Sequence, residues 1–317
     1  MRHIALTTEE FSQSVNGSPR RGDGRRNGST PRWGYQPMLE PVTYLRVKSL
    51  LPCTVAMLLM VTPVRAQQAA QPSAPAVDAT ALAKQSQNPV GSLVSVPFQF
   101  NFNTGGDLGE RTFLNVNFQP VIPFRLTDRW NVIARTIVPL ESVPGDAGTR
   151  FSGVGDIQLQ LFVTPAAPRA IIWGLGGAFS FPTATIDPVQ TGTWAAGPSL
   201  VLVKMTGSFV LGGLVSQIWP LADAGDARET SLLTIQPAVN FNFGHGWAIA
   251  FSPVITANWD APVGDRWTVP VGLGLTRTVV FNRRPMNLGI SYNYNIGHPA
   301  GTAGEQLRFT VTLLYPR

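Results

Sequence analysis

The sequence predicts an all-β protein, a single antiparallel transmembrane β-barrel of about twelve strands over residues 92–317. The clearest observation is a pair of segments, 231–243 and 247–259, in which apolar and polar side chains alternate with a period of two. This period is typical of strands with one apolar and one polar face, whereas a helix would spread the same residues around its surface. Each segment is longer than the usual strand of about 5–6 residues and matches the ~9–11 tilted residues that cross a bilayer.

The composition also favours a membrane protein that crosses the bilayer with strands. Of the 317 residues, 13% are charged and 44% are hydrophobic, and the mean hydropathy is only +0.08. The sequence contains no run of about eighteen apolar residues, which a helical membrane protein would show. Few charges together with many glycine, asparagine, threonine and aromatic residues are typical of a barrel in which neutral polar residues separate the apolar ones.

Three segments precede the predicted barrel. Residues 1–44 are basic and show no periodicity, and we interpret them as a disordered extension or as the result of a mis-assigned start, with Met38 as the true start. Residues 45–66 combine basic residues, a short apolar stretch and small residues before a cleavage site after Ala66, which predicts a signal peptide. Residues 67–91 are interpreted as a periplasmic linker that could form a short helix, either as a tether or as a small plug in the lumen.

The alternation continues from residue 94 to the end of the chain. It predicts twelve strands, an even number as in single-chain bacterial barrels, at residues 94–103, 114–122, 130–138, 156–164, 171–181, 194–203, 209–219, 231–243, 247–259, 267–281, 286–296 and 307–315. Because proline cannot donate to a strand ladder, bulges or strand ends are expected at six prolines, Pro97, Pro120, Pro198, Pro237, Pro253 and Pro270. Arg277 falls on the apolar face, and we expect it near a bulge or reaching the periplasmic rim.

The predicted connections alternate between short and long. Short ones follow the even strands, at 165–169, 205–208, 244–246 and 282–285, and longer ones follow the odd strands, at 141–152, 182–192, 220–229 and 297–304. Short turns at one end and long loops at the other are typical of the periplasmic and extracellular ends of an outer-membrane barrel, and tryptophans lie near both predicted rims. The sequence therefore predicts a place in the outer membrane of a Gram-negative bacterium, with membrane lipid and the barrel-assembly machinery as partners.

Charge and cysteine content argue against a nucleic-acid-binding protein and against a disulfide-linked fold. The net charge of +6 is concentrated before the barrel, because residues 1–66 hold nine basic and four acidic residues, whereas residues 67–317 hold fifteen and fourteen. A nearly neutral mature chain argues against nucleic acid as a partner. The single cysteine, Cys53, lies in the predicted signal peptide, so no intrachain disulfide is possible.

The inward-facing side chains of the predicted barrel are mostly neutral amides and hydroxyls. A barrel of about twelve strands has a narrow lumen, so only a small solute could pass. We propose as lumen-lining residues Asn117, Gln119, Arg135, Asp156, Gln158, Gln236, Asn240 and Arg308. Such side chains suit a neutral polar solute, although they could instead bond to one another in a closed interior. We expect Arg135 and Asp156 to pair across neighbouring strands, either as a constriction or as a structural ion pair.

Several segments resemble a known family. They are residues 82–89, 117–140, 153–157, 194–198, 267–270 and 307–316. They are similar to bacterial outer-membrane barrels labelled as meta-pathway phenol-degradation proteins or simply as transporters, and sometimes misnamed neuromedin U. The resemblance covers about residues 80–317, and it implies an outer-membrane barrel and the passage of small compounds, aromatic ones among them.

The sequence offers no catalytic, cofactor or metal site. A barrel hydrolase needs a histidine beside a serine with an orienting group, but His3 lies before the signal peptide, and His245 and His298 lie in a predicted turn and loop. We therefore expect no enzyme and no cofactor. The predicted function is a passive outer-membrane channel for small, neutral or aromatic solutes, and the alternative is a structural or translocator barrel with a plugged lumen.

Overall fold

The computed structural model describes residues 79–167, 170–223, 231–282 and 284–316, and the predicted extension, signal peptide and first part of the linker lie outside them. The described elements are α1 Ala79–Ser86, β1 Val94–Thr104, η2 Gly106–Leu108, β2 Phe113–Phe118, β3 Val121–Arg125, β4 Trp130–Pro144, η3 Asp146–Gly148, β5 Arg150–Val154, β6 Ile157–Pro165, β7 Ile172–Phe181, η4 Asp187–Val189, β8 Thr193–Thr206, β9 Phe209–Asp223, β10 Leu232–Gly244, β11 Trp247–Phe251, β12 Ile255–Asn258, η5 Val263–Asp265, β13 Trp267–Phe281, β14 Arg284–Gly297 and β15 Glu305–Tyr315. Within these ranges, no helix has the length and apolar character needed to cross a bilayer.

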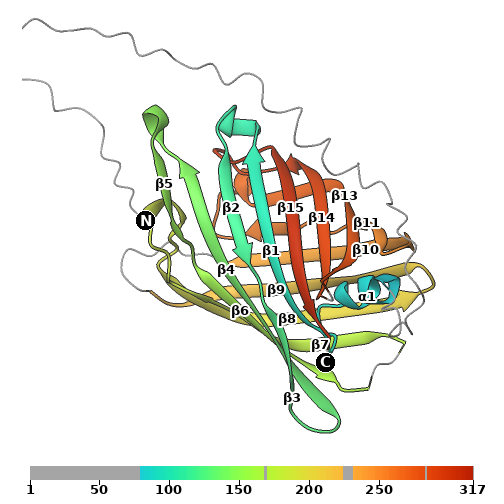
Figure 1. Ribbon diagram of the computed structural model, residues 1–317. Coiled ribbons are helices and arrows are strands. Elements are labelled where there is room, and N and C mark those ends of the chain that lie inside the picture. The colour runs from blue at the N-terminus through green and yellow to red at the C-terminus, as the bar shows by residue number, and fades with distance from the viewer. Residues whose placement is uncertain (1–78, 168–169, 224–230, 283, 317) are drawn as a thin grey trace, which may run out of the picture. The chain divides into compact units, whose positions relative to one another are not determined.

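The strands form one closed antiparallel barrel, as the sequence predicts (Figure 1). Three of its twelve strands are each interrupted once, so that β2 continues into β3, β5 into β6, and β11 into β12. The first and last strands close the barrel through pairs from Val94 with Tyr315 to Thr104 with Glu305. Apart from β5, which pairs with β4 alone, every described strand has a partner on each side, which is the condition for strands to exist in hydrocarbon.

The outer face of the barrel is apolar, because every second side chain along each strand points outward. Exposed outward side chains include Phe100, Phe102, Leu140, Leu175, Leu200, Leu202, Val215, Phe241, Ile249, Leu273, Leu275, Ile290 and Phe309. Tryptophans contact one another at both ends, Trp130 with Trp173 near the short turns and Trp259 with Trp267 near the long loops. An apolar belt between aromatic rims is the surface of a lipid-facing barrel, so the chain is placed in the outer membrane of a Gram-negative bacterium.

Irregularities in strand pairing explain the six prolines at which the sequence predicts bulges or strand ends. Proline has no backbone N–H to donate. Beside an unpaired stretch this removes no hydrogen bond between strands, because the neighbouring strand places no carbonyl acceptor there. Pro120 and Pro253 lie inside interruptions, Pro97 and Pro237 lie opposite them, pairing between β8 and β9 is absent around Pro198, and the register shifts next to Pro270.

Arg277 points outward at the short-turn end of β13. It pairs in register with Trp247, and its guanidinium carbon lies 4.9 Å from the centroid of that indole ring. The arginine therefore lies at the rim, where a cation–π contact accommodates its charge beside the apolar belt.

A compact apolar core fills the barrel at the short-turn end. Its buried members are Val90, Val121, Ile133, Phe162, Val201, Val203, Val210 and Leu214. Simple alternation assigned polar residues to the inner face, so this cluster departs from the sequence-based expectation. Buried apolar side chains need apolar partners rather than water, and Val90 comes from the segment that precedes the barrel.

The segment 79–90 docks against this end of the barrel. Lys84 Nζ donates to the carbonyl oxygen of Gly207 at 2.8 Å, and the side-chain amides of Gln87 and Asn242 exchange two hydrogen bonds of 3.1 Å. Leu82 and Ala83 of α1 are buried, and Val90 joins the apolar core. The helix and the residues after it thus close part of the short-turn end.

Candidate functional site

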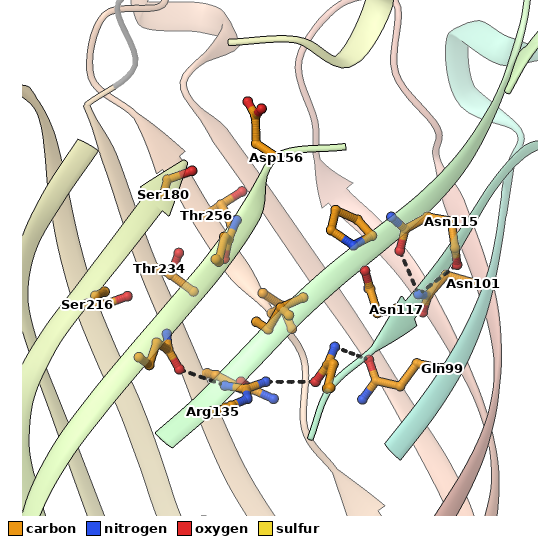
Figure 2. Close-up of a pocket in the computed structure, with 18 of the residues that line it drawn as sticks. Gln99, Asn101, Asn115, Asn117, Arg135, Asp156, Ser180, Ser216, Thr234 and Thr256 are labelled. Atoms are coloured by element: carbon orange, nitrogen blue, oxygen red, sulfur yellow. Dashed lines mark hydrogen bonds between the residues drawn. The ribbon is translucent and has the colours of Figure 1, made fainter. Parts of the chain in front are cut away.

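A cavity of about 430 Å³ lies inside the barrel, beyond the apolar core towards the long loops. Figure 2 shows side chains from strands far apart in the sequence converging on this space. One wall, formed by β15, β1, β2, β4 and β6, carries long polar and charged side chains, whereas the opposite wall carries mostly short ones, with Ile218 and Gln236 among its longer members.

The first row of long side chains crosses four strands as a continuous chain of hydrogen bonds. Arg308 Nε donates to Asn101 Oδ1 at 2.6 Å, Asn101 Nδ2 donates to Asn115 Oδ1 at 3.0 Å, and Asn115 Nδ2 donates to Glu141 Oε1 at 3.0 Å. These residues are successive register partners on β15, β1, β2 and β4. A guanidinium and a carboxylate are thus connected through two amides instead of touching each other.

The second row is centred on Arg135 of β4. Its Nη1 donates to Gln160 Oε1 at 3.0 Å and its Nη2 donates to Gln119 Oε1 at 3.0 Å, while Gln119 Nε2 donates to Gln99 Oε1 at 3.1 Å (Figure 2). The amide oxygens fix the guanidinium plane and leave its charge without a carboxylate partner. The only ion pair within the described ranges joins Arg125 and Asp128, outside the cavity.

The opposite wall leaves the cavity open because its side chains are short. Ser180, Ser216, Thr234 and Thr256 line it from β7, β9, β10 and β12 (Figure 2). An adjoining cavity of about 130 Å³ is lined by glycines and small residues of β13 and β14, and also by Arg308. The arginines therefore face free space bordered by hydroxyl groups.

A second cavity of about 230 Å³ extends from Arg135 towards the short-turn end. It shares Gln99, Gln119, Arg135 and Gln236 with the first cavity. Its other lining residues include apolar-core valines and, from the docked segment, Ser86, Gln87 and Pro89. Arg135 thus stands at the junction between a polar space and a partly apolar one.

Asp156 holds the loop between β7 and β8 over the cavity. Its Oδ1 accepts hydrogen bonds from the backbone amides of Thr183 at 3.0 Å and Ala184 at 2.9 Å. Its Oδ2 accepts from the amide of Thr191 at 3.0 Å and from the hydroxyl of the same residue at 2.5 Å. Thr191 and Val189 of this loop line the cavity, so the loop narrows the long-loop end.

The expected pair of Arg135 and Asp156 is not formed, and this prediction is wrong. Arg135 lies opposite Gln160 in the register of β4 and β6, so Asp156 is four residues further along the neighbouring strand. Figure 2 shows the two side chains at different heights in the lumen. Both side chains point into the barrel, but side chains on the same face of a sheet meet only when they are close to one another in the strand register.

The structure brings most of the proposed lumen residues to one cavity. Asn117, Gln119, Arg135, Asp156, Gln158, Gln236 and Arg308 line the first cavity, and Asn240 lines the second. Glu141 also lines the first cavity, although it falls in a loop predicted from the sequence. It lies an even number of residues from Arg135 on β4, which would have indicated that it also points into the barrel. Its Oε2 is buried and has no hydrogen-bond partner among the described residues.

Comparison with known proteins yields structural likeness alone. No protein-family model matches the sequence, and no curated protein matches it. An outer membrane channel from Pseudomonas putida F1 superposes with a TM-score of 0.54 and 16% identity, covering 70% of this chain and 94% of that one. The NanC porin gives a TM-score of 0.45 and 10% identity, covering 71% of this chain and 100% of that one. Identities this low show the fold and nothing finer.

The exclusion of an enzyme, drawn from the sequence, is corrected by the same comparison. Outer membrane phospholipase A from Escherichia coli also matches, with a TM-score of 0.42 and 12% identity, covering 76% of this chain and 99% of that one. One fold can host unrelated functions, so barrel architecture does not decide between a channel and an enzyme. The chain has the fold of an outer-membrane β-barrel.

Proposed function

We propose that this barrel is a passive outer-membrane channel for small solutes, with aromatic compounds among them. The observation that carries the proposal is the pair of adjoining cavities of about 430 Å³ and 230 Å³ that share four lining residues. A barrel whose interior served packing alone would fill this volume with side chains, as the apolar core does at the short-turn end.

The lining supports passage of molecules that exchange hydrogen bonds. Amides and hydroxyls border the first cavity, and each can donate or accept as a solute replaces water. The apolar side chains at the edge of the second cavity favour solutes with an apolar body. Together they support the expectation of small solutes, including aromatic ones.

Planar-bilayer recording combined with liposome swelling tests the proposal. The folded chain should give a small, stable conductance and should speed swelling in phenols more than in disaccharides, because the cavities admit small molecules only. Liposomes containing heat-unfolded protein serve as the control. If the folded chain gave no conductance and did not speed swelling in any solute, the channel would be contradicted.

A structural or translocator barrel with a plugged lumen is the second candidate, and the docked segment 79–90 favours it. Gln87 is hydrogen-bonded to Asn242 of β10, and Val90 belongs to the apolar core. Under this alternative the full chain gives no conductance, whereas a chain lacking residues 79–90 conducts. Equal conductance of the two chains would contradict a plug.

A further inference from the structure

We propose that Arg135 and Arg308 bind the carboxylate of a small acid whose apolar body lies against the valines of the second cavity. This inference rests on the proposed channel function and narrows its solute class. The juxtaposition of unpaired guanidinium groups with an apolar patch inside one lumen carries it.

Both guanidinium groups keep donors available for a ligand. Each has five N–H donors and uses two of them, Arg135 on Gln160 and Gln119, and Arg308 on Asn101 and Gln306. Arg135 Nε and Arg308 Nη1 make no hydrogen bond to the described part of the chain, and both residues line the first cavity. The amide oxygens that hold the arginines are neutral, so they orient the charges without neutralising them.

Asp156 and one oxygen of Glu141 have other partners, and Oε2 of Glu141 has none among the described residues. Asp156 accepts four hydrogen bonds from the β7–β8 loop, and Glu141 accepts from Asn115. Neither forms an ion pair with an arginine. A planar carboxylate on the solute would match the fork geometry of a guanidinium and supply the missing negative charge.

The surroundings of Arg135 determine what the rest of the ligand should be. Its register partner Val121 and the inward residues Val201, Val203 and Val210 line the second cavity directly beyond it. These valines are almost fully buried, so on this side the cavity is bordered by apolar packing that offers a hydrophilic anion no hydrogen bonds, whereas a ring or short alkyl body can pack against it. The site therefore favours an amphipathic monocarboxylate over a sugar acid or inorganic anion.

Three probes separate the contribution of the carboxylate from that of the apolar body of the ligand. Benzoate carries both, benzamide carries the body without the charge, and acetate carries the charge without the body. Titration calorimetry with the full chain folded in detergent should show benzoate binding at least tenfold more tightly than either of the others. Equal binding of benzamide and benzoate would overturn the role of the arginines, and equal binding of acetate and benzoate would overturn the role of the valines.

Variants locate the site. Arg135→Gln should weaken benzoate binding roughly tenfold to a hundredfold, the range for losing a hydrogen bond to a charged group. Arg308→Gln should weaken it in the same direction, and Arg135→Lys should lie between wild type and Arg135→Gln, because it keeps the charge and loses the fork. Arg277→Gln, on the outer face, is the matched control and should bind like the wild type.

Heat-modifiable migration confirms that each variant is folded before titration. Unchanged benzoate affinity in folded Arg135→Gln and Arg308→Gln would refute the site, as would absence of benzoate binding to the wild type. The bilayer and swelling measurements fail independently of this result: a barrel that binds benzoate but never conducts refutes the channel, and one that conducts without binding benzoate refutes only the carboxylate site.

Discussion

Removing the Asp156 carboxylate should release the β7–β8 loop from the mouth of the lumen. Asp156→Ala deletes the acceptor of four hydrogen bonds from Thr183, Ala184 and Thr191. Because Thr191 and Val189 line the cavity, we expect the loop to move away from it and the conducting path to widen. Asp156→Asn should have a smaller effect, since one amide oxygen can still accept from Thr183 and Ala184.

The size of the effect follows from the hydrogen bonds lost. A hydrogen bond to a charged group contributes about 1.5–3 kcal/mol, which gives roughly 6–12 kcal/mol for four as an upper limit. Water at the mouth solvates the freed N–H groups, so a net cost of about 3–6 kcal/mol is more realistic. Even the lower figure changes the ratio of docked to released loop by more than roughly a hundredfold.

Single-channel recording measures the change. The Asp156→Ala barrel should show higher mean conductance and more open-channel noise than the wild type, with Asp156→Asn between them. Asp146→Ala is the matched control, because Asp146 is exposed in another long loop and accepts the hydrogen bonds of Thr149 through its backbone carbonyl. Identical conductance and noise in wild type and folded Asp156→Ala would refute the reasoning.

Four further substitutions test the fold. Gly176→Ala should prevent folding in detergent, because an added Cβ would lie 1.6 Å from a carbonyl oxygen of β6, whereas Gly213→Ala, with its nearest atom at 3.4 Å, should fold and show heat-modifiable migration. Phe162→Ala should lower the free energy of unfolding by about 3–5 kcal/mol, since this side chain is 1% exposed in the apolar core; a loss below about 1 kcal/mol in urea titration would contradict that packing. Arg277→Ala should cost about 0.5–1 kcal/mol in the same titration, because it loses the contact with Trp247, and a larger loss would indicate a role beyond this contact.

The strands could be predicted from the sequence because lipid imposes the same constraint along the whole outer face. A polar residue facing hydrocarbon is costly wherever it lies, so parity held from β1 to β15 and located even Arg277 on the outside. The prolines likewise indicated the places where ladder pairing breaks, since a missing donor is a local property of the chain.

The inner face could not be predicted in the same way, because nothing uniform borders it. Phe162 shares the inward parity of Gln160, yet it is buried among valines while Gln160 holds Arg135. What an inward residue meets depends on side chains from distant strands and, for Phe162, on the core that Val90 joins. The same reason explains why Arg135 does not pair with Asp156. Alternation predicts which side chains point into the barrel, whereas their positions along the barrel axis depend on the register between strands, which alternation does not give.

The arrangement of charge inside the lumen also argues against a purely structural role for the arginines. Packing alone would favour apolar side chains at these positions, because a buried charge without an ionic partner is destabilising. Here Arg308 and Arg135 are held by rows of amides on adjacent strands, and the short hydroxyl-bearing residues opposite leave space in front of them. A barrel that keeps two oriented cations beside open volume, with an apolar surface just beyond, is arranged to contact a molecule that carries both an anionic group and an apolar body.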